Sequence, residues 1–336
     1  MTTPGRPPTM EDVAAEAGVS RALVSLVMRG SPKVSELRRA RVLEAAERLR
    51  YRPNAMARSL ASSRTMTIGV LLNDLHNPFF ADIAGGIEAL ASELGYQLLL
   101  GTGRRHPERE RTVVTSFVDY RVDGLILVSP RLDEADLAAA ARSIPTVVTG
   151  REIDAPEIDT LAIDEPLGVR AVVSYLAGLG HTEILHVTGG DGAGAATRLQ
   201  CFRATMEAAG LGPGRLIEGD FTEEAGVQAA QAILTRGDLP TAVFAANDLT
   251  AAGMMDTFVR AGLRIPADIS LVGYDNIYIA ALRQLSLTTV DQPRAAMGRQ
   301  ALELLLERID GRTERVRRLL EPRLIVRDTV GRARSR

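Results

Sequence analysis

From Met66 onward, short apolar runs alternate with segments of helical periodicity, and this alternation restricts the fold more than any other feature. Apolar runs flanked by helical segments are typical of parallel strands buried beneath helices. Eight or nine such strands over about 260 residues fit two wound lobes better than one sheet. The runs are MTIGVLL, YQLLLGT, DGLILVS, IPTVVTG, TLAID, EILHVTG, TAVFAAN and DISLVGYD. The helical segments cover residues 79–95, 107–121, 167–180, 195–210, 223–235 and 249–261.

The first 65 residues carry no strand-like run and show three short helical segments instead. These span residues 10–17, 20–29 and about 36–50, the last preceded by Ser35 as its expected N-cap. Gly18 can end the first helix in a left-handed conformation. Ser20 can cap the second helix, whose N-terminus then points toward a phosphate. Two helices joined by such a short turn predict a helix-turn-helix.

The second of these segments has an outward face suited to contact with DNA. Val24, Val27 and Met28 recur at helical spacing and define its buried face. The opposite face is small, basic and partly apolar, whereas a merely solvated helix would carry Glu and Lys. In a helix-turn-helix the second helix enters the major groove. The outward face consists of Arg21, Ala22, Ser25, Leu26 and Arg29.

Individual side chains on this face suit different chemical groups of DNA. Arg21 can donate to guanine or to a phosphate, and Ala22 with Leu26 forms an apolar pair for a thymine methyl. Ser25 and Thr9 are candidate phosphate contacts.

Charge also separates the N-terminal segment from the rest of the chain. Residues 1–65 hold 12 Lys and Arg against 6 Asp and Glu, whereas the remainder holds 28 against 36. A basic end on an acidic body predicts that this end contacts a polyanion and the body does not. The alternative is a three-helix module that binds another protein.

Residues 53–65 contain the helical stretch NAMARSL, followed by the linker SSRT. Two turns of helix are marginal in isolation, so this stretch can fold on binding. Leu60 then has no core to join and can act as a minor-groove wedge. The candidate DNA contacts here are Asn54, Ala57 and Leu60. The alternative is a linker helix that packs on the body.

A glycine-rich stretch, GGDGAGAA at residues 189–196, follows a predicted strand and opens a helix. Gly190, Gly192 and Ala195 match the loose dinucleotide fingerprint, but no acidic residue ends a following strand at the usual distance. We therefore prefer a loop that lines a cleft for another ligand.

Neither a catalytic set nor a set of metal ligands is apparent in the sequence. The four histidines are scattered without metal-ligand spacing, and no nucleophile elbow, P-loop or C-x-x-C motif occurs. Cys201 is the single cysteine, which excludes an internal disulfide framework. With no membrane-spanning or signal segment, we expect a cytoplasmic protein that is not an enzyme and needs no cofactor or metal.

Taken together, these motifs resemble the lactose-repressor/galactose-repressor (LacI/GalR) family of bacterial transcription regulators. The resemblance runs from about Thr9 to Thr329 with several specific motifs in order. They are MEDVAAEAGVSRALVS, VSELRRARVLEAAERLRYRPNAMARSL, TIGVLLNDLHNPFFADIAGGIE, RVDGLILVS, GLGHTEILHVTGG, RLQCFRATMEAAGL, VFAANDLTAAG, ISLVGYDN and LTTVDQP.

The resemblance implies an α/β protein with a helix-turn-helix headpiece, a hinge helix, and a two-lobed core like a periplasmic sugar-binding protein. It also implies a homodimer on near-palindromic double-stranded operator DNA, with a small-molecule effector between the lobes. The expected boundaries are 1–52 for the headpiece, 53–65 for the hinge, 66–330 for the core and 331–336 for the tail. The first lobe would comprise residues 66–161 and 291–315, and the second 162–290 and 316–330.

The resemblance also assigns the effector site. Phe79 and Phe80 would face the cleft from the first lobe. Arg198, Phe221, Asn247 and Asp275 would face it from the second lobe, where rings can stack and charged groups can fix polar atoms. We expect Arg198 and Asp275 to contact the effector rather than to hold the fold.

Three departures from the family pattern limit what can be carried over. Leu26 stands where an arginine often reads bases, which predicts an unusual operator half-site. Gly150 stands where many sugar-responsive members have an aspartate. The C-terminus lacks leucine heptads, so tetramers are not expected. Sugars and sugar derivatives are the favoured effectors, nucleobases and a protein co-regulator are alternatives, and either induction or co-repression fits the sequence.

Overall fold

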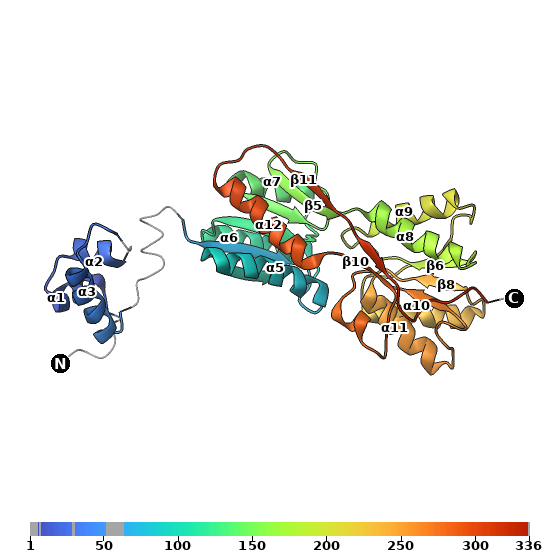
Figure 1. The fold of residues 1–336 in the computed structure, drawn as a ribbon. Helices are drawn as coiled ribbons and strands as arrows, with labels where there is room; N and C mark the ends of the chain where they lie inside the picture. Colours follow the sequence, from blue (N-terminus) through green and yellow to red (C-terminus); the bar gives the residue numbers. More distant parts are fainter. Residues whose placement is uncertain (1–5, 7, 29–30, 52–63, 335–336) are drawn as a thin grey trace. The chain divides into compact units, whose positions relative to one another are not determined.

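The computed structural model describes residues 6, 8–28, 31–51 and 64–334. The chain divides into two compact units, Met1–Thr65 and Met66–Arg336. Figure 1 traces both units along the sequence from blue to red. Below, the first unit is the headpiece and the second is the core.

The described part of the headpiece contains three helices around a small apolar centre. Val13, Val24 and Val42 are fully buried there, one from each helix. Gly18 ends the first helix at φ 65°, in the predicted left-handed conformation. The helices are α1 (Met10–Ala17), α2 (Arg21–Met28) and α3 (Glu36–Arg48).

The predicted headpiece helices are confirmed with small corrections. α1 has the predicted bounds, and α3 ends at Arg48 rather than near residue 50. Ser35 occupies the N-cap position of α3 as predicted, but its side chain makes no capping hydrogen bond. Met28 is only partly buried, whereas Val24 and Val27 are buried as expected.

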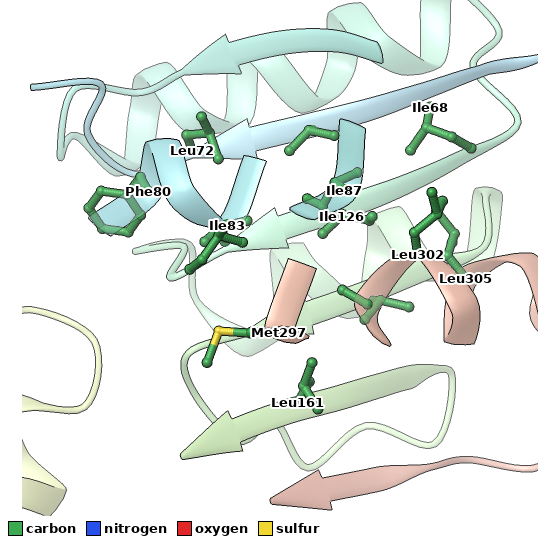
Figure 2. Packing of buried hydrophobic residues seen from close by; sticks show 14 of the residues in the cluster. Ile68, Leu72, Phe80, Ile83, Ile87, Ile126, Leu161, Met297, Leu302 and Leu305 are labelled. Carbon is green, nitrogen blue, oxygen red and sulfur yellow. The ribbon is translucent and has the colours of Figure 1, made fainter. Parts of the chain in front are cut away.

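The first lobe of the core is a parallel sheet with the strand order β11-β5-β4-β3-β1-β2. The apolar runs follow from burial on both faces, because Ile68 and Val70 pack with α5 and α12 while Leu71 packs with α6 and α7. Figure 2 shows the first of these two interfaces. The elements are β1 (Thr67–Leu72), α5 (Pro78–Leu94), β2 (Gln97–Thr102), α6 (Pro107–Asp119), β3 (Gly124–Val128), α7 (Glu134–Ser143), β4 (Thr146–Thr149), β5 (Ile158–Ile163), α12 (Arg294–Ile309) and β11 (Arg317–Leu320).

The second lobe is a smaller parallel sheet with the strand order β7-β6-β8-β9. α8 and α9 cover one face, and α10 and α11 cover the other. A separate antiparallel pair joins β10 to β12. The elements are α8 (Glu165–Gly178), β6 (Ile184–Val187), α9 (Ala195–Ala208), β7 (Arg215–Ile217), α10 (Glu223–Arg236), β8 (Ala242–Phe244), α11 (Asp248–Arg260), β9 (Ser270–Val272), the 3₁₀ turn η1 (Tyr278–Ala281), β10 (Thr289–Asp291) and β12 (Arg323–Ile325).

The chain passes between the two lobes three times. It leaves the first sheet after β5, returns to it through α12 and β11, and leaves again toward β12. The predicted crossings at 161/162 and 315/316 both come too early. β5 continues to Ile163, and β11 pairs with β5 from Arg317 to Leu320, which places both segments in the first lobe.

Each apolar run predicted as a strand contributes one, and each predicted helical segment contains a helix. The predicted segments do not include α7, α12, β7, β10, β11 or β12. The four strands among these have three or four residues each. Their pairing partners lie far along the chain for β11 and β12, so local sequence pattern carries little signal for them.

α5 and α12 pack with their backbones in close approach, and glycines make this approach feasible. A Cβ atom added at Gly86 would overlap the backbone of Ala295, and one added at Gly298 would overlap the backbone of Ile83. Gly85, the neighbour of Gly86 in α5, has open space around it. The close packing of α5 on α12 therefore requires glycine at position 86 but not at position 85.

We expect Gly86→Ala to lower the free energy of unfolding by about 1–3 kcal/mol or more, because the added methyl forces the helices apart. Gly85→Ala is the matched control and should raise it by up to about 1 kcal/mol through helix propensity. Urea unfolding of both variants measures the difference. Equal effects of the two substitutions would show that the close approach is not needed.

Candidate functional site

The outward face of α2 is partly free and partly committed to the headpiece core. Arg21 and Ala22 are exposed, as predicted. Ser20 accepts a hydrogen bond at its Oγ from the backbone N–H of Leu23 at 3.3 Å, which caps the helix. Leu26 is half-buried and packs against the headpiece core, so its side chain is less exposed than its position on the helix predicted.

Two candidate DNA contacts have partners within the headpiece. Arg21 forms an ion pair with Glu11 at 3.3 Å, and both side chains are exposed, so the pair is weak and can be exchanged for a phosphate. The Thr9 hydroxyl donates to Asp12 at 2.7 Å within a capping box that starts α1. Hydrogen bonds from Thr9 also hold the pKa of the Asp12 carboxyl below its usual value.

Two arginines outside the predicted set brace the turns of the headpiece. Arg41 of α3 donates to the backbone carbonyl of Ala17 at 3.0 Å, next to the turn at Gly18. Arg39 donates to the carbonyl of Ser31 at 2.6 Å. Ser25 is half-buried on α2. The remaining predicted contacts, Arg29, Asn54, Ala57 and Leu60, lie outside the described residues.

A cavity of about 420 Å³ lies in the core between residues of the two lobes. The six residues predicted for the effector site all line it, which brings together positions up to 196 apart in number. They are Phe79, Phe80, Arg198, Phe221, Asn247 and Asp275. Residues from other strand ends complete the lining and were missed, among them Asn73, Asn77, Arg105, Ser129, Arg131, Gly150, Glu165 and Gln292.

The cavity wall has an unusual concentration of left-handed backbone. Four non-glycine lining residues have positive φ, namely Arg105 at 65°, Ser129 at 50°, Phe221 at 68° and Asp275 at 114°. Such residues are uncommon and cost free energy unless their surroundings fix them. Their gathering around one cavity indicates a site whose shape is built rather than incidental.

The aromatic residues are held by the ends of helices and by glycines. Asn77 caps α5 by accepting from the backbone N–H of Phe79 at 3.0 Å, which places Phe79 and Phe80 edge to face with ring centres 5.3 Å apart. The Phe221 ring lies against Gly189 and Gly192, where any Cβ would overlap it. The glycine-rich loop therefore makes room for an aromatic ring of the cleft.

Arg198 is a structural residue as well as a lining residue, so the expectation that it does not hold the fold is wrong. Its guanidinium donates twice to Glu165, at 2.7 and 3.0 Å, and once to the Ala246 carbonyl at 2.6 Å. It also lies 3.6 Å from the centre of the Tyr274 ring. Removing one partner of a buried ion pair commonly costs ~3–5 kcal/mol.

Asn247 acts on the site through Phe221. Its Oδ1 accepts from Thr250, from the backbone N–H at 3.0 Å and from the hydroxyl at 2.8 Å, and so caps α11. Its Nδ2 donates to the Phe221 carbonyl at 3.1 Å. The amide thus fixes the left-handed backbone that presents the Phe221 ring.

Asp275 lies buried at the end of the second sheet. Gln292 donates to its carboxyl at 2.6 Å, and its own backbone N–H donates to the Val290 carbonyl at 2.9 Å. Burial raises the pKa of Asp275 to about 7. Burial and the nearby charge of Asp275 also raise the pKa of Asp248, so the two carboxyls disfavour each other's ionisation.

Gly150 has a positive φ of 83°, and a Cβ there would overlap the Ser129 hydroxyl. An aspartate therefore does not fit this position without rearrangement. Within the described residues, no group of three or more His, Cys, Asp or Glu side chains is arranged to hold a metal ion. No described helix is both long and apolar enough to cross a bilayer.

Comparison with known proteins yields two domain matches and relatives that cover nearly the whole chain. Residues 9–54 match "Bacterial regulatory proteins, lacI family", and residues 173–330 match "Periplasmic binding protein-like domain". The HTH-type transcriptional repressor PurR of Photobacterium profundum is 35% identical over 329 residues, covering 96% of this chain and 98% of its own. The HTH-type transcriptional repressor CytR of Escherichia coli K12 is 35% identical over 328 residues, covering 96% of each.

Solved structures agree with these matches. The lac repressor dimer bound to operator and the anti-inducer ONPF is 31% identical, with a TM-score of 0.89 over 97% of this chain and 100% of the other. The complex of the transcriptional regulator CelR with cellobiose is 35% identical, with a TM-score of 0.73 over 96% and 99%.

The raised pKa of Asp275 predicts how stability depends on pH. The folded state holds the Asp275 proton more tightly than the unfolded state, so the protonated carboxyl favours the folded state. This stabilisation is complete at acidic pH and is lost as the pH rises from about 4 to about 7. An asparagine at this position would not titrate. We therefore expect Asp275→Asn to gain on the order of 1–3 kcal/mol of unfolding free energy relative to wild type between pH 4 and pH 8. Urea unfolding across this range measures the difference. A difference that is flat or falls with pH would contradict the prediction.

Proposed function

This chain belongs to the lacI family of bacterial regulatory proteins and is a DNA-binding transcriptional repressor, and on that premise we propose that a small molecule bound between its core lobes controls its hold on operator DNA. The protein acts as a homodimer, with two headpieces on a near-palindromic operator. The effector occupies the cavity lined by Phe79, Phe221 and Asp275.

The headpiece supports the DNA-binding half of this proposal. Its α2 presents Arg21 and Ala22 to solvent behind a braced turn, and residues 1–65 carry the excess of basic residues. An exposed recognition helix next to basic charge is what a groove-reading helix-turn-helix needs. In the lac repressor structure with operator, the bound form is a dimer, which supports the same assembly here.

The cavity carries the effector half of the proposal. Residues of both lobes meet around it, so a ligand there changes the free energy of any motion of one lobe against the other. Its volume of about 420 Å³ lies in the range of small-molecule sites. Aromatic rings beside buried polar groups suit a ligand with an apolar face and several polar substituents.

A sugar or sugar derivative fits these features best. CelR, which matches over nearly the whole chain, has been solved with cellobiose. A nucleobase would also stack on phenylalanine rings, and a protein co-regulator would act from outside the cavity. Neither a solute-binding protein without a headpiece nor an α/β enzyme agrees with repressor relatives that cover 96% of the chain.

The first functional prediction concerns the headpiece. A chain truncated to residues 66–336 should bind no operator, because the DNA-reading helix is gone. For the full protein, operator affinity should fall by roughly 10³-fold or more between 50 and 200 mM salt if two headpieces contact six or more phosphates. Fluorescence anisotropy with labelled operator measures both. Operator binding by the truncated chain, or a flat salt response, would overturn the assignment.

The second functional prediction concerns Asp275. A thermal-shift screen of sugars, nucleobases and their derivatives should identify an effector, and Asp275→Asn should weaken it roughly 10- to 150-fold by removing a charge-assisted acceptor. Operator affinity without effector should stay near wild type. Asp291→Asn is the matched control. Asp291 ends β10 and accepts a hydrogen bond from Asn276 at 2.9 Å, but it does not line the cavity. Loss of effector binding in the control alone would place the site elsewhere.

A further inference from the structure

We propose that the effector is an anion, and that Arg131 recognises its carboxylate or phosphate group. The inference rests on the cavity being the effector site. It names the chemical class of the ligand and a specificity-determining residue that neither the sequence pattern nor the predicted site included.

Arg131 sits in a loop that is fixed from two sides. On one side, the Glu110 carboxylate accepts from the backbone N–H groups of Arg131 and Leu132, at 2.7 and 3.1 Å. On the other, Arg151 donates to the carbonyls of Pro130 and Leu132, both at 3.1 Å. Carboxylate and guanidinium thus hold the backbone on both sides of Arg131, directly after β3.

Fixing this loop has a free-energy cost that points to a function. Glu110 is fully buried, and burial raises the pKa of its carboxyl. One of its carboxylate oxygens, Oε1, has no hydrogen-bond partner. A buried acid that serves the backbone of one short loop is destabilising in itself, and it is expected where that loop presents a preorganised side chain.

The guanidinium of Arg131 is largely withdrawn from water at the cavity wall. Its side chain is 12% exposed, and its Nε is buried without a hydrogen-bond partner. Its Nη1 donates to both carboxylate oxygens of Asp191 at 2.8 Å. The Asp191 side chain is 81% exposed on the glycine-rich loop of the other lobe.

Asp191 is therefore a weakly held counterion. Within the described part of the chain, its carboxylate makes no other hydrogen bond or ion pair, and exposed carboxylates gain little from such pairing. A half-buried arginine paired with an exposed acid from a loop is a guanidinium whose partner can be exchanged. A ligand oxyanion inside the cavity would supply the same charge and acceptor geometry without the loop.

Three other arginines line the cavity, and each is already engaged. Arg151 donates to the two loop carbonyls described above, and the other two are paired with carboxylates. Arg198 is neutralised by the buried Glu165 through two hydrogen bonds. Arg105 also pairs across the lobes, with Asp220 at 3.2 Å, but Thr222 donates to that carboxylate from its backbone N–H at 3.1 Å and fixes it. Arg105 is thus a closing contact with a held partner, and it provides a matched comparison for Arg131.

The class of ligand follows from this arrangement. A neutral sugar would leave Arg131 paired with Asp191, whereas a sugar acid or a sugar phosphate would displace Asp191 and gain a charge-assisted hydrogen bond. Carboxylate and phosphate share this chemistry, so the experiment treats them as separate arms. Inorganic phosphate and acetate are the anionic probes, chloride at matched ionic strength is the blank, and cellobiose is the neutral probe.

The experiment measures probe binding to the full chain by calorimetry in wild type and three variants. Arg131→Gln should weaken phosphate or acetate binding roughly 10-fold or more. Asp191→Asn should strengthen it several-fold, because the competing carboxylate is removed. Arg105→Gln measures the general effect of removing a positive charge from the cavity lining and should weaken anion binding less than Arg131→Gln. The larger of the phosphate and acetate effects identifies the group that the effector carries.

Opposite signs for Arg131→Gln and Asp191→Asn separate anion recognition from a simple latch between the lobes. If the pair only closes the lobes, both substitutions shift binding in the same direction, and the proposal is overturned. Equal losses in Arg105→Gln and Arg131→Gln would overturn it too, since general charge would then suffice. The proposal is also overturned if the anions bind equally well to wild type and to Arg131→Gln.

Failure of the inference and failure of the effector site give different results. If cellobiose or another neutral metabolite binds and the binding is lost in Asp275→Asn, the cavity is the effector site and only the anionic class is wrong. If neither neutral nor anionic probes respond to any substitution in the cavity, the proposed site itself is wrong.

Discussion

The second lobe is organised around the buried guanidinium of Arg198. This one group bonds Glu165, at the start of the helix that follows the first crossing between lobes, and the Ala246 carbonyl, just beyond β8. It also lies over the ring of Tyr274, just beyond β9. A charge withdrawn from water requires each of these partners. Arg198 thereby fixes the strand ends from which the cavity is built.

The left-handed residues around the cavity depend on such fixed surroundings. Phe221 keeps its conformation because Asn247 donates to its carbonyl and glycines leave space for its ring. Asp275 keeps its conformation beside Gln292 and the backbone of Val290. Strained residues persist where neighbours determine them, and the result is a cavity shaped before the ligand arrives. The residues that line the cleft are therefore held in place by their neighbours.

Sequence alone predicted the elements of local character and the cleft residues that the family resemblance supplied. The turn at Gly18 and the alternation of strands and helices after Met66 leave local patterns in the sequence. The helices and strands in these regions could therefore be predicted. β11 was missed because its pairing with β5 joins Arg317 to Thr160, and no local pattern records such a contact. The structural role of Arg198 was missed for the same reason, since Glu165 lies 33 positions away. Arg131 belongs to no motif, and its position at the cavity becomes apparent only in the structure.

Arg294 shows how the cavity is connected to the first lobe. It begins α12, where the chain returns from the second lobe, and it donates to the backbone carbonyl of Asp275. Its Nε also donates to Asp82 of α5 at 2.9 Å, on the helix that starts with Phe79 and Phe80. α5 and α12 pack closely at Gly86 and Gly298, so a change in the position of Asp275 acts on both helices together. Under the proposed function, a ligand that repositions Asp275 would displace these two helices together rather than one loop.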